Sequence, residues 1–308
     1  MKNRIGELKS FVAGKSAAAT LPEPFHTVER FCVFIGHPRT GSTLVGSIID
    51  AHPDAVMSHE LLAPKLLMKE QKPTREVFEM ILENSASSGR SDGKRFGNGY
   101  KYSVPEGWHG RHRAIRVIGD KNAGKTTRFL GIAPPEAREA GQAPRIDRLR
   151  RRVGMPLRIV QVVRRPEDTV TSIMRKTKRH PGPDEAIEIF LELSRINRRL
   201  RDNTPSKELH LVRLEELIAD PAGGIRAMLA FLGLEQDEAF INNAASIVFR
   251  KPSKAGSGEG VSTSAELKPE EVERELTLTP EHSERIAEAL GDDPAYAPYL
   301  NGTIALPA

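Results

Sequence analysis

The stretch 30–43, RFCVFIGHPRTGST, decides the fold of this chain of 308 residues. Its apolar run, 31–35, predicts a buried strand, and a loop with glycines at both ends, Gly36 and Gly41, follows it. From Ser42 onward, apolar residues recur at helical spacing until the HPD segment at 52–54. A strand, a glycine loop and a helix N-terminus in this order surround anions with backbone N–H groups. The stretch therefore predicts a phosphate-type anion loop at 36–43.

The rest of the chain alternates strands with helices. Strands are expected at 114–118, at 157–163 and at the start of 209–234, and amphipathic helices at 74–84, 145–154 and 183–202. This alternation predicts an α/β fold with a doubly wound, mainly parallel sheet and helices on both faces. We expect one domain over 1–308, with a core at about 30–250, a mobile Gly/Ser-rich segment at 253–266 and a C-terminal helix at about 279–291.

The composition is that of an ordinary globular protein, and its positive charge suits an anionic ligand. There are 46 Lys and Arg against 41 Asp and Glu, a net charge of +5. No nucleic-acid recognition motif accompanies the basic residues, so no nucleic-acid partner is expected. Cys32 is the single cysteine, and no apolar run is long enough to predict a membrane span. A cytoplasmic location is expected.

A second glycine string competes for the role of phosphate loop. Residues 119–126, GDKNAGKT, match the Walker A pattern at every specified position. The strand before them is short and contains Arg116, and the buried strand 157–163 ends in arginines instead of the acid that would hold Mg²⁺. The context therefore favours 36–43. A P-loop kinase or NTPase using 119–126 remains an alternative, as does a non-catalytic nucleotide-binding protein of the same fold.

Three blocks of sequence resemble the sulfotransferases. Residues 37–54, HPRTGSTLVGSIIDAHPD, are similar to that family's 5′-phosphosulfate loop in its P-R-[ST]-G-[ST]-T version. Residues 162–172, VVRRPEDTVTS, resemble the 3′-phosphate motif R-x-P-x-D-x-x-x-S, and 212–234 resemble a later strand and helix, with Leu214 at the usual Tyr position. The resemblance implies a P-loop NTPase-like fold and metal-independent sulfuryl transfer from 3′-phosphoadenosine-5′-phosphosulfate (PAPS) to a hydroxyl acceptor.

The same resemblance assigns the donor-binding residues. It implies that Arg39 neutralises the sulfate and the leaving oxygen, and that Arg164 and Ser172 bind the 3′-phosphate; an Arg164–Asp168 ion pair is the alternative. The 5′-phosphate would be held by the backbone amides of Thr40, Gly41, Ser42 and Thr43. A segment at 249–256 faintly resembles another family segment that closes over the 3′-phosphate, which makes Arg250 and Lys251 candidate ligands.

Catalytic residues are implied beyond the loop. Glu60, just after the HPD segment, occupies the place of the family's general base. His59 is the rival base, and His109 and His112 are less favoured candidates than His59. We expect a bound sulfate to raise the pKa of Glu60 by like-charge repulsion. Lys121 fits the family's sulfate-contacting lysine, and Lys125 is expected on a helix surface.

The acceptor stays open at this stage. Residues 85–112 carry aromatic and basic side chains and lie where family members build the acceptor side. Carbohydrate or glycolipid, a small alcohol and peptide tyrosine are all compatible with this segment. A lid formed by 253–266 on donor binding is a further expectation.

Overall fold

The computed structural model describes residues 21–90, 95–96, 100–132, 143–176, 181–248 and 278–304. Arg250, Lys251 and the predicted mobile segment 253–266 lie outside the described residues, as does part of the segment 85–112.

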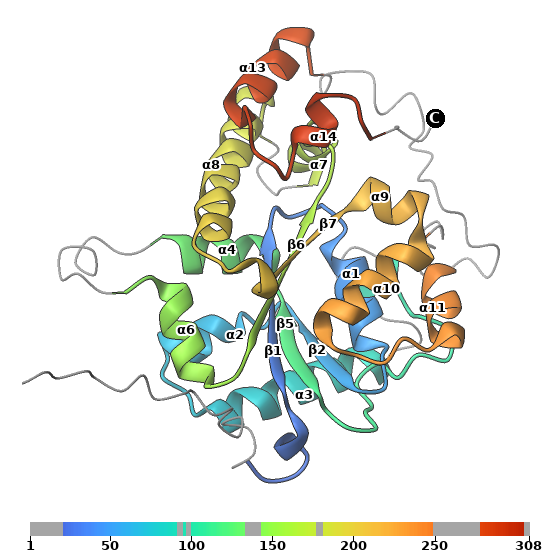
Figure 1. Cartoon of the computed structure of the whole chain (residues 1–308). Coiled ribbons are helices and arrows are strands. Elements are labelled where there is room, and N and C mark those ends of the chain that lie inside the picture. The colour runs from blue at the N-terminus through green and yellow to red at the C-terminus, as the bar shows by residue number, and fades with distance from the viewer. Residues whose placement is uncertain are drawn as a thin grey trace, which may run out of the picture.

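A five-stranded sheet forms the centre of the molecule (Figure 1). Its order is β2-β5-β1-β6-β7, and every neighbouring pair is parallel. The strands are β1 Arg30–Gly36, β2 Ala55–His59, β5 Val117–Lys121, β6 Leu157–Val163 and β7 Leu209–Arg213. A separate antiparallel pair joins β3 Arg95–Phe96 to β4 Tyr100–Lys101. The predicted α/β class with a parallel sheet is confirmed.

Helices cover both faces of the sheet because the strands are apolar on both sides. Along β1, Phe31, Val33 and Ile35 belong to one core cluster, and Cys32 and Phe34 belong to the other. The first cluster is closed by α2 Ala63–Met68, α3 Thr74–Arg90, α4 Ala123–Gly131, α6 Arg145–Val153 and α8 Pro183–Asp202. The second is closed by α1 Ser42–Asp50, α9 Leu214–Ala219, α10 Pro221–Leu232 and α11 Glu238–Ala245. Figure 1 shows α1, α10 and α11 to one side of the strands and α2, α4 and α6 to the other.

A third core cluster joins the end of β6 to α7 Pro166–Lys176, α8 and α13 Pro280–Leu290. Thr279 caps α13 and Pro280 begins it, within the range of about 279–291 expected for the C-terminal helix. The chain then passes through α14 Ala297–Leu300. The remaining short elements are the 3-10 turns η2 Phe25–Thr27 and η3 Ser206–Glu208.

Several boundaries differ from the expected ones. The strand expected at 114–118 runs over Val117–Lys121, so it ends at the lysine, and β2 was not predicted at all. Helix α7 begins at Pro166, which places Asp168 inside its first turn. No helix of the described residues is long and apolar enough to cross a membrane. Within the same residues, no group of three or more His, Cys, Asp or Glu side chains could hold a metal ion.

Candidate active site

The loop between β1 and α1 leaves a helix N-terminus open. Arg39 and Gly41 have φ angles of 73° and 87°, the left-handed region, and no side chain caps α1 at Gly41. The φ of 87° favours glycine at residue 41, where a Cβ would also lie 2.9 Å from Leu214 Cδ1. The first-turn amides of a helix have no intrahelical acceptor, and they sit at the positive end of the helix dipole. The loop therefore offers an anion site where the sequence predicted it.

Lys121 and Glu60 meet beside this helix N-terminus. Lys121 ends β5, and its Nζ donates to Thr43 Oγ1 at 3.1 Å and to Glu60 Oε1 at 3.3 Å. The strands β2 and β5 set this meeting, because His59 pairs with Lys121 in register and the Glu60 N–H donates to the Lys121 carbonyl at 2.9 Å. The Lys121 side chain is 4% exposed and that of Glu60 is 53% exposed. The structure thus brings together three residues that the sequence assigned to one site.

Burial and charge shift the pKa values of these groups. Desolvation lowers the pKa of Lys121, although Glu60 and Asp120 oppose it. Partial burial pushes the pKa of Glu60 upward, but the Lys121 ammonium and His59 outweigh burial, and the net pKa is lowered. The expected rise for Glu60 is therefore not a property of the unliganded protein, because the nearest charge is a cation. Burial and Lys121 lower the pKa of His59 to about 4, so its imidazole is neutral near pH 7 and stays a rival base.

Arg39 and Ser172 also come together, from the loop and from α7. Arg39 Nε donates to Ser172 Oγ at 3.4 Å, so the two phosphate motifs of the sequence converge. Arg164 donates through Nη2 to Asp168 Oδ2 at 3.2 Å, the ion pair that was its alternative role. Arg164 is one-third exposed, and this exposed ion pair is weak enough to open for a phosphate.

His37, which was not predicted as a site residue, connects the 36–43 loop to α8 and to the C-terminal segment. Its ring is fully buried and stacks on Phe190 with the ring centroids 4.5 Å apart. Nε2 lies 2.9 Å from the Phe190 carbonyl and Nδ1 lies 3.1 Å from Tyr296 Oη, which fits a neutral ring that donates at Nε2 and accepts at Nδ1. Burial lowers the pKa of His37 to about 4. The C-terminal segment thereby supports the anion loop.

Gly46 is a second residue that the sequence did not single out. A Cβ on this residue of α1 would lie 2.8 Å from Lys121 Cγ and 3.1 Å from Lys121 Cβ. The glycine therefore leaves a notch in α1 through which the Lys121 stem reaches Thr43, one turn earlier on the helix. A glycine within a predicted helix is the sequence signal that could have found it.

The Walker-like string 119–126 is not a loop. Gly119 lies within β5, where a Cβ would approach the Cys32 carbonyl oxygen to 2.1 Å, and Gly124 lies within α4. Lys125 is exposed on α4, as the sequence predicted. Between the strand and the helix only Asn122 remains, and one residue cannot wrap a phosphate. This geometry removes the P-loop kinase or NTPase reading of the string.

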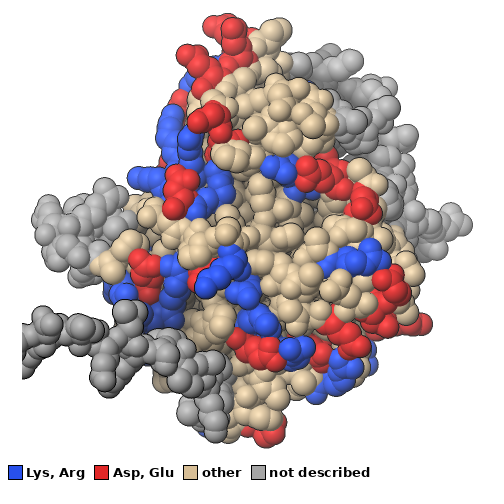
Figure 2. Space-filling model, in the orientation of Figure 1, with Lys and Arg blue, Asp and Glu red and all other residues tan. Residues whose placement is uncertain are grey.

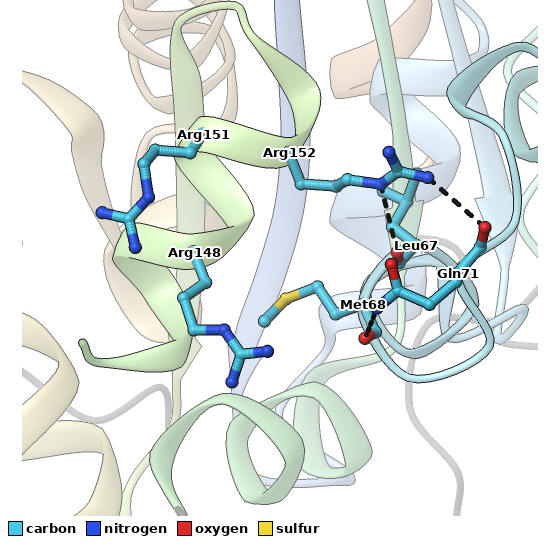
Figure 3. Close-up of a pocket in the computed structure, with 6 residues that line it drawn as sticks. All are labelled: Leu67, Met68, Gln71, Arg148, Arg151 and Arg152. Atoms are coloured by element: carbon cyan, nitrogen blue, oxygen red, sulfur yellow. Dashed lines mark hydrogen bonds between the residues drawn. The ribbon is translucent and has the colours of Figure 1, made fainter. Parts of the chain in front are cut away.

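A pocket of about 300 Å³ lies elsewhere, between α2 and α6. Figure 3 shows that the arginines lining it do not converge: Arg151 and Arg152 point in opposite directions. Arg152 donates to the carbonyls of Leu67 and Lys72 at 3.2 and 2.7 Å, so its guanidinium holds the end of α2. None of the predicted site residues lines this pocket.

The described part of the expected acceptor segment lies along α1. The Tyr102 carbonyl accepts from Ser47 Oγ at 2.7 Å, in the middle of this helix. The Trp108 N–H donates to the Ala51 carbonyl just beyond the last turn of α1, and His109 Nδ1 lies 3.6 Å from Asp50 Oδ2 at the same end. The Trp108 backbone and His109 thus lie at the end of α1 opposite the anion loop.

Charges of both signs share the surface around the sheet. On the face in Figure 2, Lys and Arg side chains of the described residues are interspersed with Asp and Glu. Among the described residues, many charged side chains form ion pairs, such as Arg226 with Glu238 and Arg285 with Asp184. The net positive charge is therefore not gathered into one continuous patch on this face.

Solved structures similar to this chain are sulfotransferases. One is mouse sulfotransferase SULT7A1 complexed with PAP, with 14% identity, coverage of 91% of this chain and 90% of that chain, and a TM-score of 0.46. Another is sulfotransferase STF1 from Mycobacterium tuberculosis H37Rv, with 17% identity, coverage of 86% and 77%, and a TM-score of 0.44. No family model and no curated protein matches the sequence. Likenesses at this distance do not assign an activity to the chain.

Proposed function

We propose that this protein is a PAPS-dependent sulfotransferase that acts on a hydroxyl acceptor. The observation that carries the proposal is the meeting of Glu60, Lys121 and Thr43 at the open N-terminus of α1. A proton acceptor, a buried cation and an anion cradle in contact suit the transfer of an anionic group to an oxygen nucleophile. The Arg39–Ser172 contact adds a second cation on the loop side.

The residues present fit the donor. The uncapped first turn of α1 and the left-handed residues Arg39 and Gly41 would hold the 5′-phosphate through backbone N–H groups. Ser172, with Arg164 released from Asp168, would bind the 3′-phosphate. PAPS, when bound, supplies the sulfuryl group. Arg250 and Lys251 stay candidate ligands from the sequence.

The chemistry asked of the chain is proton removal and charge neutralisation. Glu60 would accept the proton of the acceptor hydroxyl as the acceptor O–S bond forms and the S–O bond to the phosphate breaks. Lys121 and Arg39 would stabilise the charge that grows on the leaving phosphate oxygen. The ion pair with Lys121 keeps Glu60 ionised, and thus able to accept a proton, before the donor binds. As Lys121 turns to the transferred group, Glu60 would lose its counter-charge and become a stronger base.

Transfer of radioactive sulfate from labelled PAPS to a panel of phenols, alcohols, sugars and glycolipids tests the proposal. The wild-type protein is expected to label at least one class, and Glu60→Gln to lose about 10²–10⁴-fold in turnover, as removal of a general base does. Glu192→Gln is a matched control, because Glu192 is 51% exposed and also lies 3.3 Å from a cation, Arg128. A wild-type protein that labels no acceptor while binding PAPS would contradict the proposed activity.

Arg39→Ala gives a second test that separates binding from catalysis. A loss of at least about 10²-fold in turnover is expected with adenosine 3′,5′-bisphosphate binding retained, if the guanidinium acts on the transition state. Calorimetric titration of the bisphosphate measures the binding half. Unchanged turnover would remove Arg39 from the mechanism.

A further inference from the structure

The backbone that carries Glu60 adopts an unfavourable conformation. Glu60 and Leu62 both have a φ of 60°, the left-handed region that non-glycine residues avoid. Each such residue is energetically costly and persists only where the surroundings enforce it. Glycine would suit position 60 better, so a glutamate there indicates that its side chain is needed in the direction this backbone gives it.

A buried carboxylate enforces the turn. Asp120 is fully buried on β5, next to Lys121. Its Oδ1 accepts from the Leu61 N–H at 3.0 Å, and its Oδ2 accepts from the Ala63 N–H at 3.2 Å. These two bonds bracket Leu62, so one side chain fixes the turn on both sides. Ser58 Oγ also donates to Oδ1 at 2.8 Å.

The hydrogen bonds of Asp120 offset the cost of burying its carboxylate. Burying a carboxylate is unfavourable unless it is well hydrogen-bonded, and burial raises the pKa of Asp120. Two of the three donors to Asp120 are backbone N–H groups of the turn after Glu60. The hydrogen bonds of this carboxylate therefore stabilise that turn. A carboxylate needed only for the sheet would have no reason to reach the segment beyond β2.

We propose that Asp120 is the positioning residue of the site: it clamps the turn 60–63 so that the Glu60 carboxylate meets Lys121 and the acceptor hydroxyl. This inference rests on the proposed function, since it gives Asp120 its role through Glu60. Loss of the clamp relaxes the turn toward ordinary φ values and swings the carboxylate away from Lys121. A displacement of about 1 Å in a catalytic group costs on the order of 10²-fold in rate.

Amide hydrogen exchange tests the clamp without an acceptor. In the wild-type protein the amides of Leu61 and Ala63 are expected to exchange slowly, because they donate to a buried carboxylate. Asp120→Asn has only one acceptor oxygen, so at least one of the two amides should lose protection. Asp54→Asn is the control, because Asp54 is also a buried carboxylate but pairs with Arg113 at the opposite end of β2. Full protection of both amides in Asp120→Asn would overturn the proposal.

A double-mutant cycle with labelled PAPS tests the route through Glu60. Asp120→Asn should lower turnover by about 10–10²-fold in the wild-type background and by less than about 3-fold in Glu60→Gln, because the residue it positions is already disabled. Affinity for adenosine 3′,5′-bisphosphate should stay within about 3-fold of wild type. Equal losses in both backgrounds would overturn the proposal and leave Asp120 a general structural role.

A rescue variant covers poor folding of Asp120→Asn. Leu62→Gly removes the left-handed strain at one residue, so adding it to Asp120→Asn should restore stability and part of the turnover. A rescue of stability with no gain in turnover would contradict the positioning role. An active wild type with an unaffected Asp120→Asn overturns only this inference, whereas an inactive wild type overturns the proposed function with it.

Discussion

Two glycine strings in this chain follow parallel strands, and only one of them makes a loop. At 36–43 the strand stops at the first glycine and five residues intervene before α1 begins. At 119–126 the strand continues past the first glycine to Lys121, and α4 begins at Ala123. The better match to a phosphate-loop pattern is therefore the poorer anion site. What decides is where the strand ends relative to the glycines, because only free backbone can turn its N–H groups toward an anion.

The two strings are nevertheless neighbours in one site. Strand β5 pairs with β1, and it delivers Lys121 to the first turn of the helix that follows the 36–43 loop. One string thus supplies backbone donors and the other supplies a side-chain cation. The predictions below separate these contributions, from the largest expected effect to the smallest.

The sharpest contrast lies within the Walker-like string itself. Lys121→Ala should lower turnover by about 10²–10³-fold, because it removes a buried cation in contact with Thr43 and Glu60. Lys125→Ala, four residues away on the exposed surface of α4, should stay within about 2-fold of wild type. Turnover with labelled PAPS measures both. The reverse order of effects would restore the Walker reading of 119–126.

His37 packs beneath the 36–43 loop, and its contribution to the free energy of unfolding should depend on pH. The pKa of His37 is about 4 in the folded protein against an ordinary value of 6.5, so below pH 6.5 the unfolded chain binds a proton that the folded chain does not. The free energy of unfolding should fall by about 3 kcal/mol between pH 6.5 and pH 4 through this residue alone. Chemical denaturation of wild type and His37→Asn at several pH values measures the difference. His26→Asn, at an exposed histidine, is the control, and an equal pH dependence in wild type and His37→Asn would refute the assignment.

The notch in α1 gives the smallest effect on turnover. Gly46→Ala should lower the free energy of unfolding, because the new Cβ would clash with the buried Lys121 stem at a cost of about 1–3 kcal/mol, which the helix preference of alanine, about 1 kcal/mol, offsets only in part. Turnover should fall about 10-fold, because the new Cβ would displace the Lys121 stem. Melting temperature and turnover are measured together. In a Lys121→Ala background the extra loss should vanish; if it persists, the notch does not act through Lys121.

Sequence patterns predicted the layers of the fold and several residues that the structure brings together at the N-terminus of α1. Apolar runs and helical spacing located β1, α1, β6 and α8, because buried strands and amphipathic helices leave strong local signals. The strand β2 was missed because its five residues follow the HPD stop directly, and β5 was placed about three residues early. Local pattern does not show which residues of a short apolar segment find a partner strand.

The supporting residues of the site could not be predicted for a related reason. His37, Gly46 and Asp120 act on segments far away in the sequence: on Tyr296, on Lys121 and on the turn at 60–63. Their roles come from tertiary contacts, and no local spacing encodes these. The Lys121 contact that lowers the pKa of Glu60 in the unliganded protein was not foreseen for the same reason, and the rise expected beside a bound sulfate stays a prediction.

Thermal stabilisation by nucleotides tests the central claim most directly, because it asks which string binds phosphate. With a chelator present, adenosine 3′,5′-bisphosphate should raise the melting temperature. At about 100-fold over its Kd the expected gain is about 2.7 kcal/mol. Mg-ATP should give no comparable shift. Stabilisation by Mg-ATP alone would contradict the account.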